Sequence, residues 1–580
     1  MPLPEFTGTL GLKRAAHLLR RATCGATKQQ IDAFSMLTPA QAIDQLFRQT
    51  LPEPLLPPDP LTGREWFVSG TTDDNSPDED LQEYFKGWFL SQILSTGVDP
   101  AFSLAYSTRE KMVFFLHSHF TTIQSKVNNS RALYFQNQLF RVFALDALNP
   151  DPLINFKELS VKVSVDNAML RLLDGNLNIK GSPNENYARE FHELFSIGRG
   201  LEGTLPAPST PGDYILFTEQ DVQAAARVFS GWEVDEDFQT IDAVTNVHRG
   251  KVRGGTLNAA SHDNEPKQFS ARFNSAIIAP DPALLNGGMA TEASALDEIR
   301  QLVDQIYGKT ETAKNICWKI YRFFVYAPHT PEASQLIDGS VITEMANTFQ
   351  ASNYKIQPVI EELLRSQHFY DAGAGVTDDN FGGIIKSPLD LVAGTLRFFN
   401  IALPDMSAQT TQFYEATGEI IAILENLGMK FFEPYDVAGY EAYHQFPVYH
   451  RSWITPNYLA RRYEFIRDVV TSSENHMFNA DVYEFVKNNY ADTIASDVRT
   501  LIVELAKYLL PVTDNLTFDE NTDDNASLTA QRLNYFRERL LQQFDETYWT
   551  TRWNRGSADL RDQLEFLFNA MLQSPEYQLS

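Results

Sequence analysis

The stretch NENYAREFHELF, residues 184–195, shows the spacing that decides the fold class. Its apolar side chains recur three or four positions apart, which places them on one face of a helix: Tyr187, Ala188, Phe191, Leu194 and Phe195. Similar spacing extends over most of the chain, whereas long alternating runs of Val, Ile and Thr are scarce. We therefore predict a mainly α protein with a large, bundle-like core of many helices.

Residues 200–292 interrupt this pattern. They are rich in Gly, Pro and Asn, and the segments 244–247 and 276–278 are predicted to be short strands. The chain is accordingly divided into a helical region at 1–199, a small β-containing insertion at 200–292 and a second helical region at 293–580. An alternative is that the two helical regions form one continuous domain.

Composition narrows the classes of function. The 580 residues include 48 Lys and Arg against 75 Asp and Glu, a net charge of −27. Such a chain repels phosphates, so binding to nucleic acid or to anionic membranes is not expected. Two cysteines, Cys24 and Cys317, exclude a disulfide framework and a Cys-rich zinc site. The chain has neither a P-loop nor a dinucleotide-binding glycine motif, so no organic cofactor is predicted.

The sequence leaves the location of the protein open. No run approaches about 18 uninterrupted apolar residues, so no membrane span is expected. The first residues, Met1-Pro2-Leu3-Pro4-Glu5-Phe6, lack the basic region and apolar core of a signal peptide. A cytoplasmic location is the default, and a periplasmic or extracellular one is the alternative for a chain that is processed or exported with a partner.

Several segments resemble one known family. In chain order they are AAHLLRRAT at 15–23, KMVFFLHSHF at 111–120, NENYARE and ELFSIG within 184–198, TEQDV and FSGW within 218–232, and HD at 262–263. Together they resemble the bacterial family called domain of unknown function 1800 (DUF1800), and most closely its subgroup from Bacteroidetes-like bacteria. The resemblance implies a large, mainly helical protein. It also implies a sulfatase-like partner, because genes of this family often lie beside those of exported sulfatase-like proteins. It supplies no agreed activity.

A candidate metal loop precedes the quoted helix. Oxygen-bearing side chains occupy positions 1, 3, 5, 9 and 12 of a calcium-loop pattern: Asp174, Asn176, Asn178, Ser182 and Glu185. Ile179 stands at the sixth position, where the pattern needs glycine. The loop therefore either binds Ca²⁺ or another divalent metal, or is an Asn-rich turn whose amides cap the next helix.

Glu190 is the candidate base or metal ligand on the helix itself. It lies at the border of the apolar face, and Glu193 is about 60° away, close enough for the two carboxylates to share a cation or a proton. Arg189 is predicted to form a surface pair with Glu193. The alternative for Glu190 is an ordinary salt bridge.

Three histidines complete the candidate catalytic set. On the helix predicted over 108–120, His117 and His119 diverge by about 200°, so one ring at most can reach a given site, and His119 is predicted to be buried. If one of them meets Glu190, the pair could ligate a metal or act as acid and base. His262-Asp263, in an irregular loop, is a second candidate that needs a third group. The alternative for each histidine is a structural role in the core.

The stretch from Tyr435 to Trp453 mixes aromatic residues with His and Pro where helical spacing fails. Such a surface could stack on sugar rings or contact a partner, and the alternative is a well-packed loop. Two functions follow from these observations. The first is a metal-assisted hydrolase or group-transfer enzyme acting at the cell envelope. The second is a non-catalytic protein, either a scaffold for a sulfatase-like partner or a calcium-stabilised glycan-binding protein.

Overall fold

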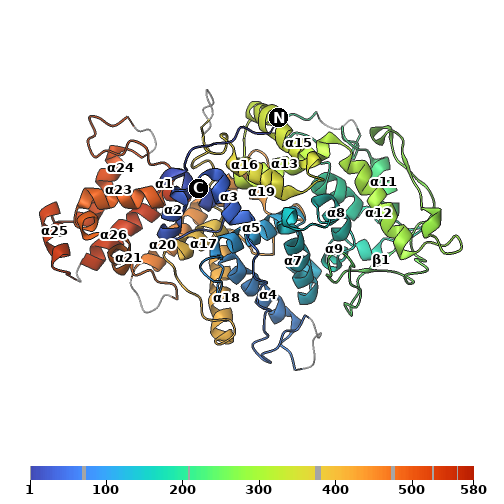
Figure 1. Ribbon diagram of the computed structural model, residues 1–580. Coiled ribbons are helices and arrows are strands. Elements are labelled where there is room, and N and C mark those ends of the chain that lie inside the picture. The colour runs from blue at the N-terminus through green and yellow to red at the C-terminus, as the bar shows by residue number, and fades with distance from the viewer. Residues whose placement is uncertain are drawn as a thin grey trace.

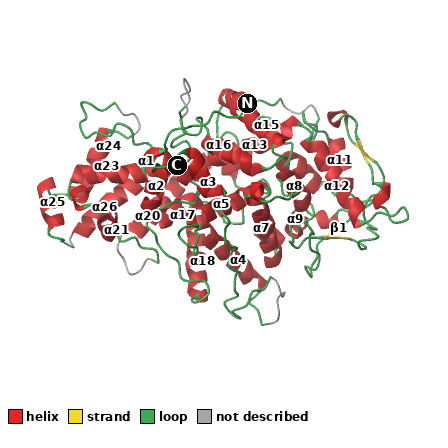
Figure 2. Cartoon of the chain, in the orientation of Figure 1, coloured by secondary structure: helices red, strands yellow, loops and turns green. Residues whose placement is uncertain are grey.

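Helices make up most of the computed structural model, which describes residues 2–67, 74–206, 210–372, 380–471, 477–524, 528–557 and 560–580 (Figure 2). The mainly α prediction is confirmed. No helix in these described ranges is both long and apolar enough to cross a bilayer.

The first helices run to the quoted segment. They are α1 (Gly11–Ala22), α2 (Lys28–Ser35), α3 (Pro39–Phe47), α4 (Asp78–Ile93), α5 (Ser103–His119), α6 (Gln124–Val127), α7 (Ser130–Ala144), α8 (Phe156–Val163), α9 (Asn167–Leu172) and α10 (Asn186–Glu190). Helix α10 continues without interruption into a π-helix at Phe191–Phe195.

In its described residues, the middle region contains one α-helix, two short 3₁₀-helices (Ala271–Phe273 and Pro282–Leu284) and two small sheets. Helix α11 (Glu219–Val228) precedes β1 (Trp232–Glu233), which pairs antiparallel with β2 (Lys251–Val252), while β3 (Lys267–Gln268) pairs antiparallel with β4 (Ile277–Ile278). The strand predicted at 276–278 is therefore confirmed as β4.

The strand predicted at 244–247 is wrong, because these residues form a turn. The Asp242 carboxylate accepts the backbone N–H groups of Val244 and Thr245, and Asn246 has a φ of 56°. An Asx-type turn of this kind competes with strand pairing.

The second half of the chain is again helical. Its helices are α12 (Glu292–Tyr307), α13 (Thr310–Phe324), α14 (Pro331–Ile337), α15 (Thr343–Ala351), α16 (Ile356–Arg365), α17 (Pro388–Phe398), α18 (Thr410–Asn426), α19 (Glu441–His444), α20 (Pro456–Val470), α21 (Val482–Asn489), α22 (Asp492–Ala495), α23 (Val498–Leu509), α24 (Ala530–Leu541), α25 (Glu546–Asn554) and α26 (Leu560–Leu572).

The molecule is elongated, and the N-terminal helices lie near its middle (Figure 1). Helices α21 to α26 form one end, and the region around α11, α12 and β1 forms the other. Helix α1 contacts α23, and the C-terminal residues of the chain lie beside α1. Segments far apart in sequence therefore meet at the centre.

Helix α5 is buried along almost its whole length, so its polar residues need partners inside the core. Glu110 has no exposed side-chain surface and accepts hydrogen bonds from Arg109 Nε at 2.8 Å and from Arg141 Nη2 of α7 at 2.6 Å. This ion pair joins α5 to α7.

Glu110→Ala should destabilise the protein strongly, because it leaves two buried guanidinium groups without their carboxylate. We expect urea denaturation to show a loss of about 3–5 kcal/mol in the free energy of unfolding. The control is Glu464→Ala, which removes the exposed pair with Arg461 and should change it by about 0.5 kcal/mol or less. Equal losses in the two variants would contradict the structural role of Glu110.

Candidate functional site

The helix that carries Glu190 ends inside the protein, and side chains from distant segments bind its last carbonyl groups. Lys319 Nζ of α13 donates to the Leu194 carbonyl at 2.5 Å, and Asn315 Nδ2 donates to that of Ser196 at 2.8 Å. His119 Nε2 of α5 lies 3.0 Å from the Phe195 carbonyl. A π-helix is uncommon and is often found at functional sites.

Glu190 is half-buried, and its carboxylate has no hydrogen-bond or ion-pair partner within the described part of the chain. Burial, followed by the negative charge of Glu193, raises the pKa of the Glu190 carboxyl to about 7. The charge of Asp436 adds to this increase, while Arg199 and Arg189 oppose it. A carboxyl with a pKa near neutrality can both give and take a proton at physiological pH.

The predicted pair between Arg189 and Glu193 is wrong. Arg189 instead binds Glu219 at 2.8 Å and Glu185 at 3.2 Å, and Glu193 binds Arg199. The prediction assumed α-helical rotation, but the i→i+5 hydrogen bonds of the π-helix slow the rotation after Glu190 and turn Glu193 inward.

His117 and His119 are both buried and point to different partners. The prediction that His119 is buried is confirmed, and its bond to the Phe195 carbonyl brings it to the helix that carries Glu190. The His117 ring stacks on Phe432, with 4.1 Å between ring centroids, and neither of its nitrogens has a partner among the described residues. Burial lowers the pKa of His117 to about 3 and that of His119 well below its usual value, so both rings are neutral. No hydrogen bond between described residues joins either ring to Glu190, and an acid–base pair with Glu190 stays a prediction.

Two of the predicted ligands in the candidate calcium loop, Asn178 and Glu185, bind other groups of the protein. Asn178 is buried, and its amide donates to the Ala226 carbonyl at 2.7 Å and accepts the Asn184 N–H at 3.1 Å. Glu185 pairs with Arg189, and the Asn184 side chain accepts the backbone N–H of Asn186.

These contacts match the alternative of an Asn-rich turn at the start of a helix. Asp174 and Asn176 lie in the same loop, and the Asn176 backbone carbonyl accepts a hydrogen bond from Arg253 Nη2 at 2.8 Å. No set of three His, Cys, Asp or Glu side chains suited to a metal ion occurs in the described ranges. A calcium or other metal site therefore stays a prediction without support from this geometry.

His262 and Asp263 belong to a buried ion network that joins the irregular region to α12. His262 Nδ1 lies 2.9 Å from the Ser230 carbonyl, and its Nε2 lies 3.4 Å from Glu298 Oε1. Lys267 binds the other oxygen of Glu298, and Asp263 pairs with Arg227 at 2.7 Å. Glu298 is the third group that the pair needed, but His262, Lys267 and Glu298 are fully buried, which favours a structural role.

A groove of about 470 Å³ lies where the sequence mixes aromatic residues with His and Pro. Aromatic and acidic side chains line it: Tyr435, Tyr440, Trp453, Tyr458, Glu425, Glu433 and Glu441. Tyr435 is 90% exposed, whereas Tyr440 and Trp453 are buried against the protein. The stretch is thus partly a packed loop and partly an open aromatic surface.

Lys319 is a site residue that the sequence analysis missed. Burial lowers the pKa of its ammonium group to about 7, and its Nζ binds only a backbone carbonyl among the described residues. The sequence feature that could have indicated this residue is its position between Trp318 and Ile320 on a predicted helix. A lysine flanked by apolar residues can bury its aliphatic chain against them.

Glu190→Gln should make the stability of the protein less dependent on pH. The folded-state pKa of Glu190 is raised from 4.5 to about 7, so its ionisation destabilises the fold as the pH rises through this range. We expect the variant to match the parent at pH 4 and to exceed it by about 1 kcal/mol at pH 8, a value reduced because the carboxyl is partly exposed. Urea denaturation across this pH range tests this. The exposed Glu419→Gln should show no such trend, and a parallel trend in both variants would contradict the prediction.

Comparison with known proteins identifies the family and nothing further. A family model described as protein of unknown function (DUF1800) matches residues 17–579, so the chain belongs to this family. No curated protein and no solved structure matches the chain.

Proposed function

We propose that this DUF1800 protein binds a neutral or amine-bearing glycan in the groove beside Tyr435. The observation that supports the proposal is a 90% exposed tyrosine on a groove that also contains carboxylates. Its volume of about 470 Å³ falls within the range of small-ligand sites.

Aromatic side chains in the groove suit the apolar faces of sugar rings. Tyr435 offers a free ring face, and the half-buried Tyr458 lies in the same lining. The indole of Trp453 packs near Tyr440 and Tyr443, with ring centroids 6.4 Å from each, so it is held in place before any ligand binds. Rigid aromatic rings lose little conformational entropy on binding.

The charges of the groove select the class of glycan. The lining contains Glu425, Glu433 and Glu441 but one lysine, Lys430, which lies 3.4 Å from Glu425. Glu433 also accepts hydrogen bonds from the N–H and hydroxyl groups of Ser125. Carboxylates accept hydrogen bonds from sugar hydroxyl groups and attract amines, but repel uronates and sulfated sugars. We therefore expect neutral or glucosamine-type oligosaccharides and exclude polyuronates.

Tyr435→Ala should weaken glycan binding about tenfold, because it removes the exposed stacking surface. Isothermal titration with β-linked glucose oligomers, glucosamine oligomers and a polyuronate measures this. Tyr435→Phe should keep the affinity, and Tyr535→Ala, at an exposed tyrosine outside the groove, is the control. Equal affinity in the Tyr435→Ala and Tyr535→Ala variants, or a preference for the polyuronate, would contradict the proposal.

One observation favours an enzyme as the second candidate function. Glu190 has the pKa of a general acid or base, and Asp436, whose charge helps to raise that pKa, belongs to the segment between Tyr435 and Gly439 that borders the groove. A hydrolase acting on the bound glycan would use Glu190 as its proton donor.

If the groove holds a substrate, Glu190→Gln should reduce cleavage at least about 100-fold and leave binding unchanged, because the amide cannot donate the catalytic proton. Chromatography of the oligosaccharides after incubation measures cleavage, and Glu419→Gln is the matched control. Undiminished cleavage by Glu190→Gln would exclude this role, and binding without any cleavage by the parent would leave the binding function alone.

A further inference from the structure

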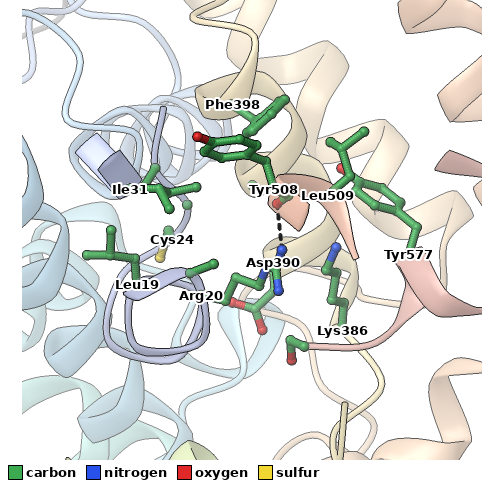
Figure 3. A pocket seen from close by; sticks show the side chains of 15 residues that line it. Leu19, Arg20, Cys24, Ile31, Lys386, Asp390, Phe398, Tyr508, Leu509 and Tyr577 are labelled. Atoms are coloured by element: carbon green, nitrogen blue, oxygen red, sulfur yellow. Dashed lines mark hydrogen bonds between the residues drawn. The ribbon is translucent and has the colours of Figure 1, made fainter. Parts of the chain in front are cut away.

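A small cavity of about 50 Å³ lies at the centre of the molecule, away from the groove. Residues of α1, α17 and α23 and of the C-terminal segment line it, and Figure 3 shows Arg20, Asp390 and Lys386 extending toward the same space. Apolar side chains such as Leu19 and Phe398 make up much of the remaining wall.

Lys386 is a buried cation that has no carboxylate partner in the described part of the chain. Its residue is 7% exposed, and among the described residues its Nζ has neither a hydrogen bond nor an ion pair. The ammonium group lies over the Tyr577 ring, 3.6 Å from the ring centroid. A cation–π contact offsets only part of the cost of burying a charge.

Arg20 adds a second positive charge to the lining. Its Nη2 donates to the Tyr508 carbonyl at 2.6 Å, a contact drawn in Figure 3, and this holds the guanidinium group at the cavity. Burial, and then the charge of Arg20, lowers the pKa of Lys386 well below its usual value. The two cations therefore repel each other in a poorly solvated space.

The acidic side chain in the described lining, Asp390, is already occupied. It accepts hydrogen bonds from Lys111 Nζ at 2.9 Å and from Ser387 Oγ at 2.8 Å. The charge of Arg462 also interacts with that of Asp390, and Arg462 Nη2 donates a hydrogen bond to the backbone carbonyl of Lys386 at 2.9 Å. Two cationic side chains, Arg20 and Lys386, thus line this cavity against one acidic side chain, although the whole chain carries a net charge of −27.

We propose that this cavity binds one small oxyanion, with Lys386 and Arg20 as its ligands. Phosphate, sulfate and a free carboxylate share the required chemistry, because each offers several acceptor oxygens to a buried ammonium and a guanidinium group. The volume exceeds that of a single water site several-fold, which suits a compact anion and excludes a sugar ring.

Cys24 also lines the cavity but does not make it a covalent catalytic site. Burial raises the pKa of its thiol to about 11, so the reactive thiolate is scarce at neutral pH. Reversible anion binding is therefore the chemistry that these side chains support.

Isothermal titration of the full chain with inorganic phosphate, sulfate and acetate, at constant ionic strength, tests this proposal. We expect saturable binding of at least one anion with one site per chain. Lys386→Met should weaken binding at least about tenfold, because it removes a charge-assisted contact. The variant should still fold, because it replaces a buried, repelled cation with an apolar side chain of similar length.

Two further variants make the result decisive. Arg20→Gln should also weaken binding, whereas Lys487→Met, at an exposed lysine on α21, should not. A preference for phosphate and sulfate over acetate would indicate a tetrahedral ligand, and the reverse would indicate a carboxylate. The absence of saturable binding of all three anions, or equal affinity in the parent and Lys386→Met, would overturn the proposal. Failure of glycan binding would not affect it, because the groove has a different lining.

Discussion

The constraint on which the candidate site depends is the need to satisfy backbone carbonyl groups where a helix ends in a dry interior. A helix leaves its last carbonyls without internal partners, and an unpaired buried carbonyl is costly. Here α10 and its π-helical continuation end inside the protein, and Lys319, His119 and Asn315 bind the carbonyls of Leu194, Phe195 and Ser196. The need to pair these carbonyl groups explains why a neutral histidine and a lysine with a lowered pKa lie at the end of the helix that carries Glu190. Glu190 itself, one turn earlier, takes no part in this bonding, and its carboxyl group has no hydrogen-bond or ion-pair partner among the described residues.

The buried cations of this protein fall into two groups. In the first group, each cation has a carboxylate at contact distance, as in the pairing of Arg141 with Glu110 and of Lys162 with Asp242. Such pairs join neighbouring segments. Removing one partner destabilises the fold, because the other charge is then buried without compensation. The second group includes the buried Arg462 and Lys386 and the half-buried Lys319, and none of them has a carboxylate within ion-pair distance among the described residues. Lys319 binds a carbonyl that would otherwise be unpaired, whereas Lys386 lines a cavity, and this difference separates a structural cation from a candidate ligand-binding one.

The sequence predicted what depends on local spacing. Apolar periodicity identified the helical fold, and the border position of Glu190 on the apolar face agrees with the half-burial of this residue in the structure. The spacing could not predict the π-helix, since residues 191–195 have ordinary helical spacing. The carbonyl groups at its end are bound by side chains of α5 and α13, which lie far away in the sequence. The His117 ring stacks on Phe432, and the cavity around Lys386 is lined by α1 and α23. In each case the contacting residues lie far apart in the sequence. No local pattern contains such contacts, so reasoning from spacing placed both histidines correctly on a helix but could not identify their partners.

The cavity and the groove impose opposite selection on ligands, and one segment connects them. Residues 384–387 carry Lys386 on the cavity side, where the Lys386 N–H donates to the Gln578 carbonyl at 2.8 Å. On the other side, the Ile385 N–H donates to His450 Nδ1 at 3.2 Å, and His450 lies in the short 3₁₀-helix Tyr449–Trp453 that supplies Trp453 to the groove. Buried hydrogen bonds of this kind fix the geometry of both linings. Because acidic side chains outnumber basic ones in the groove lining and the reverse holds in the cavity lining, the proposed glycan with a free amine would be disfavoured in the cavity by charge as well as by size. An oxyanion would likewise be repelled by the carboxylates of the groove, so the two proposed ligand classes would distinguish the two sites.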